Sequence, residues 1–221
     1  MAIGGWFLAA LCAGMLGWLG RPILVLLPES PDAQPEKPSY LTVSRAPHLD
    51  WWLAAAAITL VTIAALALPV YLMPAWLLLC GIGTWLAYID WRTHLLPTRI
   101  VGPLCVATLS AVALEAWLAG SVWVLLRAVA VGGVAYGVFW MLWWVAERRR
   151  PGSFGFGDVR FSAPLALGLG SVGIWTAVTG LYLGFVVGAV AGVALKVRGY
   201  RGGFAFGPAM LVGAVLGLVL T

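Results

Sequence analysis

Runs of about twenty apolar residues recur along almost the whole chain, and they limit what it can fold into. A helix that crosses a bilayer needs about 20 apolar residues. Charged residues make up only 10% of the sequence, against about 25% in soluble domains. The sequence therefore predicts an all-α, polytopic membrane protein, and it excludes a water-soluble enzyme, a disordered protein and a disulfide scaffold.

We expect about eight transmembrane helices, one of them short. The expected spans are 2–27, 51–68, 70–89, 100–119, 122–146, 161–173, 175–195 and 204–220. The only long polar stretch is 28–50, which contains five prolines and is too small for a second folded domain. Residues 1–221 are therefore expected to form a single integral membrane domain.

This span count places the basic residues on one side of the membrane. Lys and Arg gather in the expected loops 28–50, 91–99, 147–160 and 196–203, whereas Arg127 lies in the other half. Short loops rich in Lys and Arg remain in the cytoplasm. We therefore expect cytoplasmic basic loops and extracytoplasmic N- and C-termini. The same rule accounts for the net charge of +5, so no nucleic acid partner is expected.

The cysteines give no sign of a metal site. Cys12, Cys80 and Cys105 lie inside apolar runs, and their number and spacing do not match the CxxC pairs of structural zinc sites. A free cysteine behaves as a small apolar residue. We interpret all three as packing residues and expect no bound metal.

Acidic residues in or beside the apolar runs are functional candidates, because a charge at a helix centre costs about 2.5–3.5 kcal/mol on insertion. Glu115 and Arg127 lie at equal distances from the turn at Ser121, so we expect them to pair across a helical hairpin. Glu147 begins a basic run at a helix end, which is typical of a solvated cluster near anionic headgroups.

Asp90 and Asp158 are different, because the expected topology puts both at the cytoplasmic rim although 68 residues separate them. Gly155 and Gly157 precede Asp158 and free the backbone for positive φ or for close approach. Two carboxylates that share a proton can activate water and polarise a peptide carbonyl, which is aspartic proteolysis. Alternatively, Asp90 pairs with a loop arginine and Asp158 caps the next helix.

Three short motifs surround these residues. Residues 155–160 read GFGDVR, residues 89–97 begin with Ile-Asp and end with Leu-Pro, and residues 204–208 read FAFGP. Together they resemble the GxGD, I-D…L-P and F-G-P segments of the type IV prepilin peptidases, a family of membrane aspartic proteases. Two positions depart from the family pattern: Arg160 replaces the usual Lys, and Thr98 stands where Asn or Asp is usual.

The resemblance implies that Asp90 and Asp158 are the catalytic pair of a membrane aspartic endopeptidase. The expected substrates are type IV pilin-like precursors, whose basic N-terminal leader would be cut at the cytoplasmic face of the bacterial inner membrane. Gly155 and Gly157 would contact an extended substrate strand. The lipid bilayer would surround the enzyme.

Many members of this family also carry a zinc module between their first two helices and N-methylate the new amino terminus. Residues 28–50 contain no cysteine, so this chain lacks the zinc module. Proteolysis is expected to require no cofactor, and S-adenosylmethionine would be needed only if methylation is retained.

Other functions stay open at this point. Paired acids could form the relay of a small proton-coupled transporter, although both lie at one face rather than at the midplane. An assembly protein of a pilus or secretion system would not need them. A serine-type membrane protease would need an intramembrane histidine, whereas His48 and His94 fall in expected loops.

A ladder of small residues also needs an explanation. Glycine recurs every fourth residue on one helix face, at Gly180, Gly184, Gly188 and Gly192. Such spacing lets a second helix approach closely. The ladder fits either packing within the chain or a homodimer interface.

Overall fold

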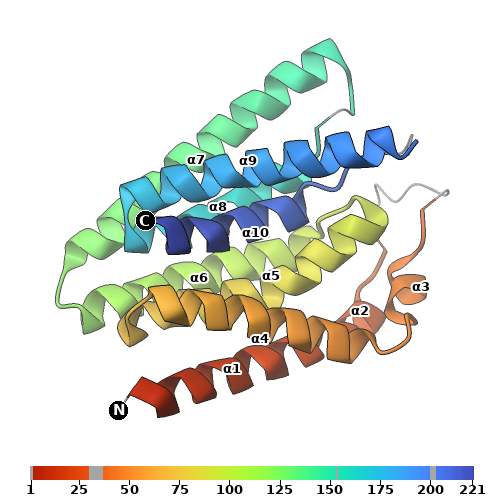
Figure 1. Cartoon of the computed structure of the whole chain (residues 1–221). Helices are drawn as coiled ribbons and strands as arrows, with labels where there is room; N and C mark the ends of the chain where they lie inside the picture. The colour runs from red at the N-terminus through yellow and green to blue at the C-terminus, as the bar shows by residue number, and fades with distance from the viewer. Residues whose placement is uncertain (1, 30–36, 153, 200–202) are drawn as a thin grey trace.

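The computed structural model describes residues 2–29, 37–152, 154–199 and 203–221, and the regular structure in these ranges is entirely helical. The long helices lie side by side in one bundle, and the start of α1 and the end of α10 lie at the same end (Figure 1). This arrangement confirms the all-α, polytopic architecture.

The element order follows the apolar runs. The N-terminal half contains α1 (Ala2–Trp18), α2 (Gly20–Leu26), α3 (Tyr40–Ser44), α4 (Leu49–Ala67), the 3-10 turn η1 (Val70–Leu72) and α5 (Met73–Thr93). The C-terminal half contains α6 (Thr98–Leu118), α7 (Val122–Arg149), α8 (Phe156–Val172), α9 (Ile174–Val197) and α10 (Gly207–Leu220).

In the part of the chain that the structure describes, six helical stretches are long and apolar enough to cross a membrane. They are Gly5–Leu26, Leu49–Ala67, Val70–Thr93, Thr98–Leu118, Val122–Arg149 and Ile174–Val197. The helices α8 and α10 have 17 and 14 residues. At about 1.5 Å per residue both are shorter than a hydrocarbon core of about 30 Å. The count of eight spans therefore stays a prediction.

Several boundaries differ from the expected ones. The first apolar run is divided between α1 and α2, and the polar stretch 28–50 contains α3 and the start of α4; residues 30–36 of that stretch lie outside the described ranges. Helix α5 continues to Thr93, so Asp90 lies inside its last turn. Helix α8 begins at Phe156, so Asp158 lies in its first turn. An acidic side chain there is favoured by the positive end of the helix dipole.

The connections confirm that the basic segments share one end of the bundle. Helices α2, α5, α7 and α9 end at the right in Figure 1, and helices α4, α6 and α8 end at the left. Arg201 lies outside the described residues. Which end faces the cytoplasm stays a prediction from the positive-inside rule.

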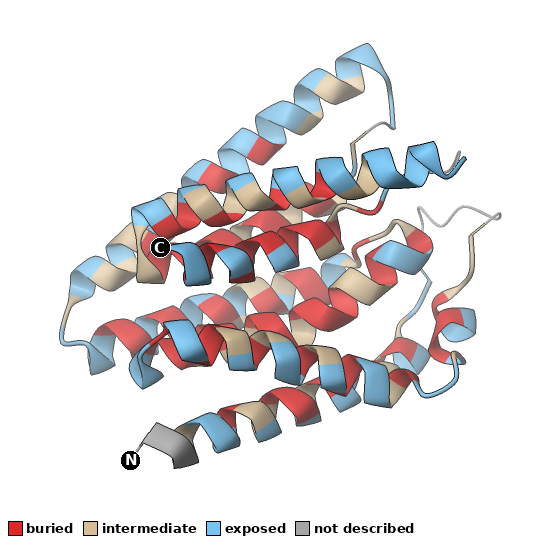
Figure 2. Ribbon diagram, in the orientation of Figure 1, coloured by how far each residue is buried: buried red, intermediate tan, exposed pale blue. Residues whose placement is uncertain are grey.

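The outside of the bundle is apolar. Phe7, Trp117 and Trp175 are more than 70% exposed, and exposed residues cover the outward faces of the helices while buried ones face inward (Figure 2). Soluble monomers rarely expose apolar patches above a few hundred Å², but lipid tails accept such a surface. The chain is a multi-pass membrane protein.

Helices α9 and α10 touch through their backbones, and the glycine ladder makes this contact. A Cβ atom added at Gly213 would overlap the backbone of Gly184, and one added at Gly217 would lie 2.5 Å from the Cα of Gly180. Gly188 faces the ring of Phe206. These ladder positions are covered by α10 within one chain, which confirms the internal-packing interpretation. Their face is not free for a homodimer contact.

We predict that Gly213→Ala lowers the melting temperature in detergent, because the added methyl group forces two helix backbones apart. Overpacking of this kind typically costs about 1–3 kcal/mol. The control is Gly137→Ala on α7, where an added Cβ meets no atom within 4 Å. This control should be neutral or stabilising by up to about 1 kcal/mol. Equal melting temperatures for both variants would contradict the close contact.

Candidate active site

Asp90 and Asp158 lie at the same end of the bundle and are both buried. Asp90 comes from the last turn of α5 and Asp158 from the first turn of α8. Their exposed fractions are 5% and 8%. The negative charge of Asp90 acts on the Asp158 carboxyl group, so the two groups lie within electrostatic range of each other. The helical packing thus brings together two acids that 68 residues separate in sequence.

A backbone amide at the start of α10 holds the Asp90 carboxylate. The Gly207 N–H donates a hydrogen bond of 2.7 Å to Oδ2 of Asp90. A Cβ atom added at Gly207 would lie 2.9 Å from this oxygen and 3.3 Å from the carboxyl carbon. Only glycine lets the backbone come this close. Gly207 therefore belongs to the site, and the only sequence signal for it was the F-G-P resemblance.

The glycines before Asp158 leave room for neighbouring side chains and do not adopt unusual φ angles. Gly155 has φ −74° and takes the N-cap position of α8, so Asp158 is not the cap. The described glycines with positive φ are Gly120, Gly152 and Gly199, so the expected positive φ is wrong at 155 and 157. Within the chain, the absence of a side chain at Gly155 leaves room for Asp158, because a Cβ added there would lie 3.2 Å from Oδ2 of Asp158; close approach by another chain stays a prediction.

The segment after α5 packs directly on the start of α8. A Cβ added at Gly157 would lie 2.8 Å from the Cβ of Leu96. Arg160 donates a hydrogen bond to the Thr98 hydroxyl and stacks over the Phe156 ring at 4.7 Å from its centroid. The two positions that depart from the family pattern, Arg160 and Thr98, therefore contact each other.

His94 contacts the backbone of two segments that form the candidate site. Its left-handed φ of 54° ends α5, and its N–H donates a hydrogen bond of 2.8 Å to the carbonyl of Asp90. Its ring Nε2 lies 2.7 Å from the carbonyl oxygen of Gly203. Gly203 lies four residues before Gly207, which binds Asp90. His94 therefore links the end of α5 to the segment that leads into α10.

The alternative in which Asp90 pairs with a loop arginine finds no support. In residues 2–29, 37–152, 154–199 and 203–221, the one ion pair joins Arg21 to Asp50, with 2.9 Å between Nη1 and Oδ2. This pair links α2 to the first turn of α4. Asp90 is satisfied by a backbone amide instead.

The expected ion pair between Glu115 and Arg127 is wrong. Glu115 is fully buried and accepts a hydrogen bond of 2.9 Å from the Ala75 N–H, in the first turn of α5. Arg127 instead donates to the carbonyls of Gly170, Ser171 and Val172, at the end of α8. Unpaired N–H and C=O groups at helix ends are strong partners for charged side chains. Glu115 and Arg127 therefore each bind backbone groups at the end of a helix.

The predictions for Glu147 and for the cysteines agree with the structure. Glu147 is partly exposed, as expected of a solvated cluster. It accepts a hydrogen bond of 2.9 Å from the Gly152 N–H in the loop after α7. Cys12, Cys80 and Cys105 are free, and Cys80 is buried in the apolar core. Across the described ranges, no three His, Cys, Asp or Glu side chains are grouped to hold a metal ion.

The fold and site define a class of protein: a helical, multi-pass membrane protein with two acids buried together at one end. The model of the type IV leader peptidase family matches residues 76–197, more than half of the chain. The chain belongs to this family and is a peptidase. The matched region contains both Asp90 and Asp158, whereas α10 lies beyond it. Comparisons with curated proteins and with solved structures gave no significant match.

We predict that Gly207→Ala lowers peptidase activity strongly while the fold persists, because the methyl group would push the Asp90 carboxylate from its position. A misplacement of about 1 Å in an active site can cost about 10²-fold in rate. The measurement is the cleavage rate of a leader-bearing precursor, with the melting temperature recorded in parallel.

The matched control for this variant is Gly102→Ala on α6, where an added Cβ meets no atom within 4 Å. It should cleave at the wild-type rate. If Gly207→Ala also cleaves at that rate, the contact between the Gly207 amide and Asp90 does not position the carboxylate.

Proposed function

We propose that this protein is an aspartic endopeptidase of the bacterial inner membrane that removes the basic N-terminal leader of type IV pilin-like precursors at the cytoplasmic face. The observation that carries the proposal is that Asp90 and Asp158 are both buried and come from helix turns at one end of the bundle, where the basic segments gather. Membership in the type IV leader peptidase family supports the same reaction.

The proposed chemistry divides the two carboxyl groups into a base and an acid. The Gly207 hydrogen bond favours a charged Asp90, and two like charges in a buried site disfavour ionisation of both. Asp90 therefore takes a proton from water, whose oxygen bonds to the scissile carbonyl carbon. Asp158 gives its proton to the carbonyl oxygen. Collapse of the tetrahedral intermediate breaks the C–N bond: the amine leaves with the proton from Asp90, and one hydroxyl of the intermediate returns its proton to Asp158 as the carbonyl group forms again.

The site suits a substrate that lies partly in the membrane. The apolar helix that follows a pilin leader occupies the bilayer, so its cleavage point would reach the rim of the bundle where the acids lie. Gly155 has an extended backbone, with φ −74° and ψ 128°, and is our candidate for pairing with an extended substrate strand. Gly157 packs against Leu96, and we assign it a structural role.

We predict that Asp90→Asn and Asp158→Asn each reduce cleavage by about 10²–10⁴-fold, because an amide cannot exchange the proton that acid–base catalysis requires. The melting temperature should stay near that of the wild type. The assay incubates detergent-solubilised protein with a pilin-like precursor and detects the released leader by mass spectrometry.

Asp50→Asn is the control, since Asp50 lies at the same end of the bundle but pairs with Arg21. It should cleave normally. Cleavage at the wild-type rate by Asp90→Asn or by Asp158→Asn would refute the assignment. If no pilin-like precursor is cut and proton flux into vesicles depends on Asp90, the transporter alternative replaces the peptidase.

We further predict that cleavage proceeds without added metal and without S-adenosylmethionine, because the two carboxyl groups supply both proton transfers. The same mass spectra, recorded with and without S-adenosylmethionine, report methylation of the product. Loss of cleavage after treatment with a chelator would contradict a metal-free mechanism. A methylated product would show that S-adenosylmethionine serves a second activity of this chain.

A further inference from the structure

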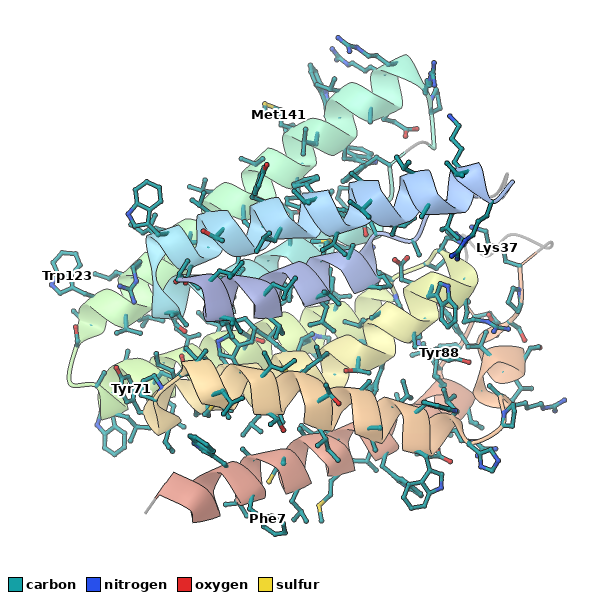
Figure 3. The ribbon with its side chains drawn as sticks, viewed as in Figure 1. Phe7, Lys37, Tyr71, Tyr88, Trp123 and Met141 are labelled. Carbon is teal, nitrogen blue, oxygen red and sulfur yellow. The ribbon has the colours of Figure 1, made fainter. Side chains whose placement is uncertain are left out.

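A cavity lies at the same end of the bundle as the carboxylate pair, and neither Asp90 nor Asp158 lines it. It has a volume of about 1000 Å³ and lies between α4, α5, α9 and α10. On α5 it is lined by Thr84, Ala87, Tyr88 and Trp91. These positions repeat at helical spacing and form one face of α5, and Asp90 is not among the lining residues. Figure 3 shows Tyr88 at this end of the bundle. The cavity therefore adjoins the candidate active site, with which it shares His94 and Gly203, but the carboxyl groups do not line it.

The cavity has the depth of one lipid leaflet. On α9 its lining runs from Val187 to Arg198, which corresponds to about 16 Å at 1.5 Å per residue. The hydrocarbon core is about 30 Å thick, so the lining covers about half of it. The walls are mainly apolar and include Leu53, Val187 and Val212.

Two cations stand at the basic end of this groove. Arg92 comes from the last turn of α5, and Arg198 follows α9 directly. Both are exposed and line the cavity, and neither forms an ion pair with another described residue. Trp52 and Trp91 line the same end and are 71% and 64% exposed. Tryptophan at this depth is typical of the interface between tails and headgroups.

We propose that this groove, bounded by α4, α5, α9 and α10, is a binding site for one anionic phospholipid of the leaflet at the basic end. The acyl chains lie on the apolar walls, and the phosphate is held between the guanidinium groups of Arg92 and Arg198. Arginine binds phosphate oxygens in a bidentate manner. The proposal depends on the membrane placement of the bundle and not on the proposed peptidase chemistry.

The charge and depth of the groove favour a lipid over the peptide substrate. A basic leader would be repelled by Arg92 and Arg198. An apolar helix that crosses the bilayer would extend past the groove, which ends at about the depth of one leaflet. A phospholipid satisfies both conditions, because its negative charge and its tails are confined to a single leaflet.

A bound lipid would also support the segment that leads into α10. Gly203, Ala205 and Pro208 line the groove, and Gly207 in the same segment donates its hydrogen bond to Asp90. Lipid binding should therefore stabilise the folded bundle. Ligands that bind only the native state raise the melting temperature with their concentration.

The test measures lipid binding to the full-length protein by native mass spectrometry and by melting temperature. Phosphatidylglycerol is compared with phosphatidylcholine of identical acyl chains. We expect one phosphatidylglycerol to remain bound and to raise the melting temperature more than phosphatidylcholine does. Equal retention and equal stabilisation by the two lipids would overturn the proposal, and so would stabilisation by inorganic phosphate alone.

The variant Arg92→Gln/Arg198→Gln should lose phosphatidylglycerol affinity by tenfold or more, because the contact with the phosphate is removed. The matched control, Arg148→Gln/Arg149→Gln, removes the same charge from the end of α7, which does not line the groove. Loss of affinity in both variants would assign the effect to general surface charge and overturn the site.

Two further measurements keep this test decisive. If the double variant fails to fold, the single variant Arg198→Gln is used, since Arg198 lies after the end of α9 and its loss disturbs no helix interior. Competition with a synthetic apolar pilin helix tests the rival occupant. Displacement of the bound lipid by this peptide, at equal concentration, would assign the groove to the substrate and overturn the proposal.

Discussion

Charged side chains buried in this bundle bind backbone groups at helix ends, and these contacts organise both ends of the structure. At one end, Arg127 donates hydrogen bonds to the last carbonyls of α8, and Glu115 accepts one from an amide at the start of α5. At the other end, the Gly207 amide donates a hydrogen bond to the Asp90 carboxylate. Unsatisfied groups in hydrocarbon cost several kcal/mol each. Helix ends thus act as the ligands of the buried charges.

Glycine makes these contacts geometrically accessible. Gly207 lets a backbone amide reach Asp90, Gly157 lets Leu96 seat against α8, and Gly213 with Gly184 lets α10 lie on α9. Since α10 carries Gly207 at its first turn, the tight packing of α9 on α10 also sets the position of the Asp90 partner. The geometry of the candidate active site therefore depends on the same helix packing, and both require glycine at these positions.

The sequence predicted the location of Asp90 and Asp158 at one end of the bundle, but it predicted the partners of the buried charges poorly. Asp90 and Asp158 stood out because carboxylates beside apolar runs are costly, and the one-sided charge distribution placed both at the same end. The pairing of Glu115 with Arg127 failed because sequence spacing gives depth along a helix but not the direction of a side chain around it. The role of Gly207 needed tertiary contacts, since 117 residues separate it from Asp90.

By itself, the sequence determined the helical, multi-pass architecture, the grouping of the basic segments at one end of the bundle, and the placement of Asp90 and Asp158 at that end, because hydropathy and charge act locally along the chain. Only the tertiary structure decided that Asp158 lies in a helix turn and not at its cap, that α10 covers the glycine ladder, and that Arg160 binds Thr98. These features depend on which helix faces meet, and that choice is made by the packing of all the helices together.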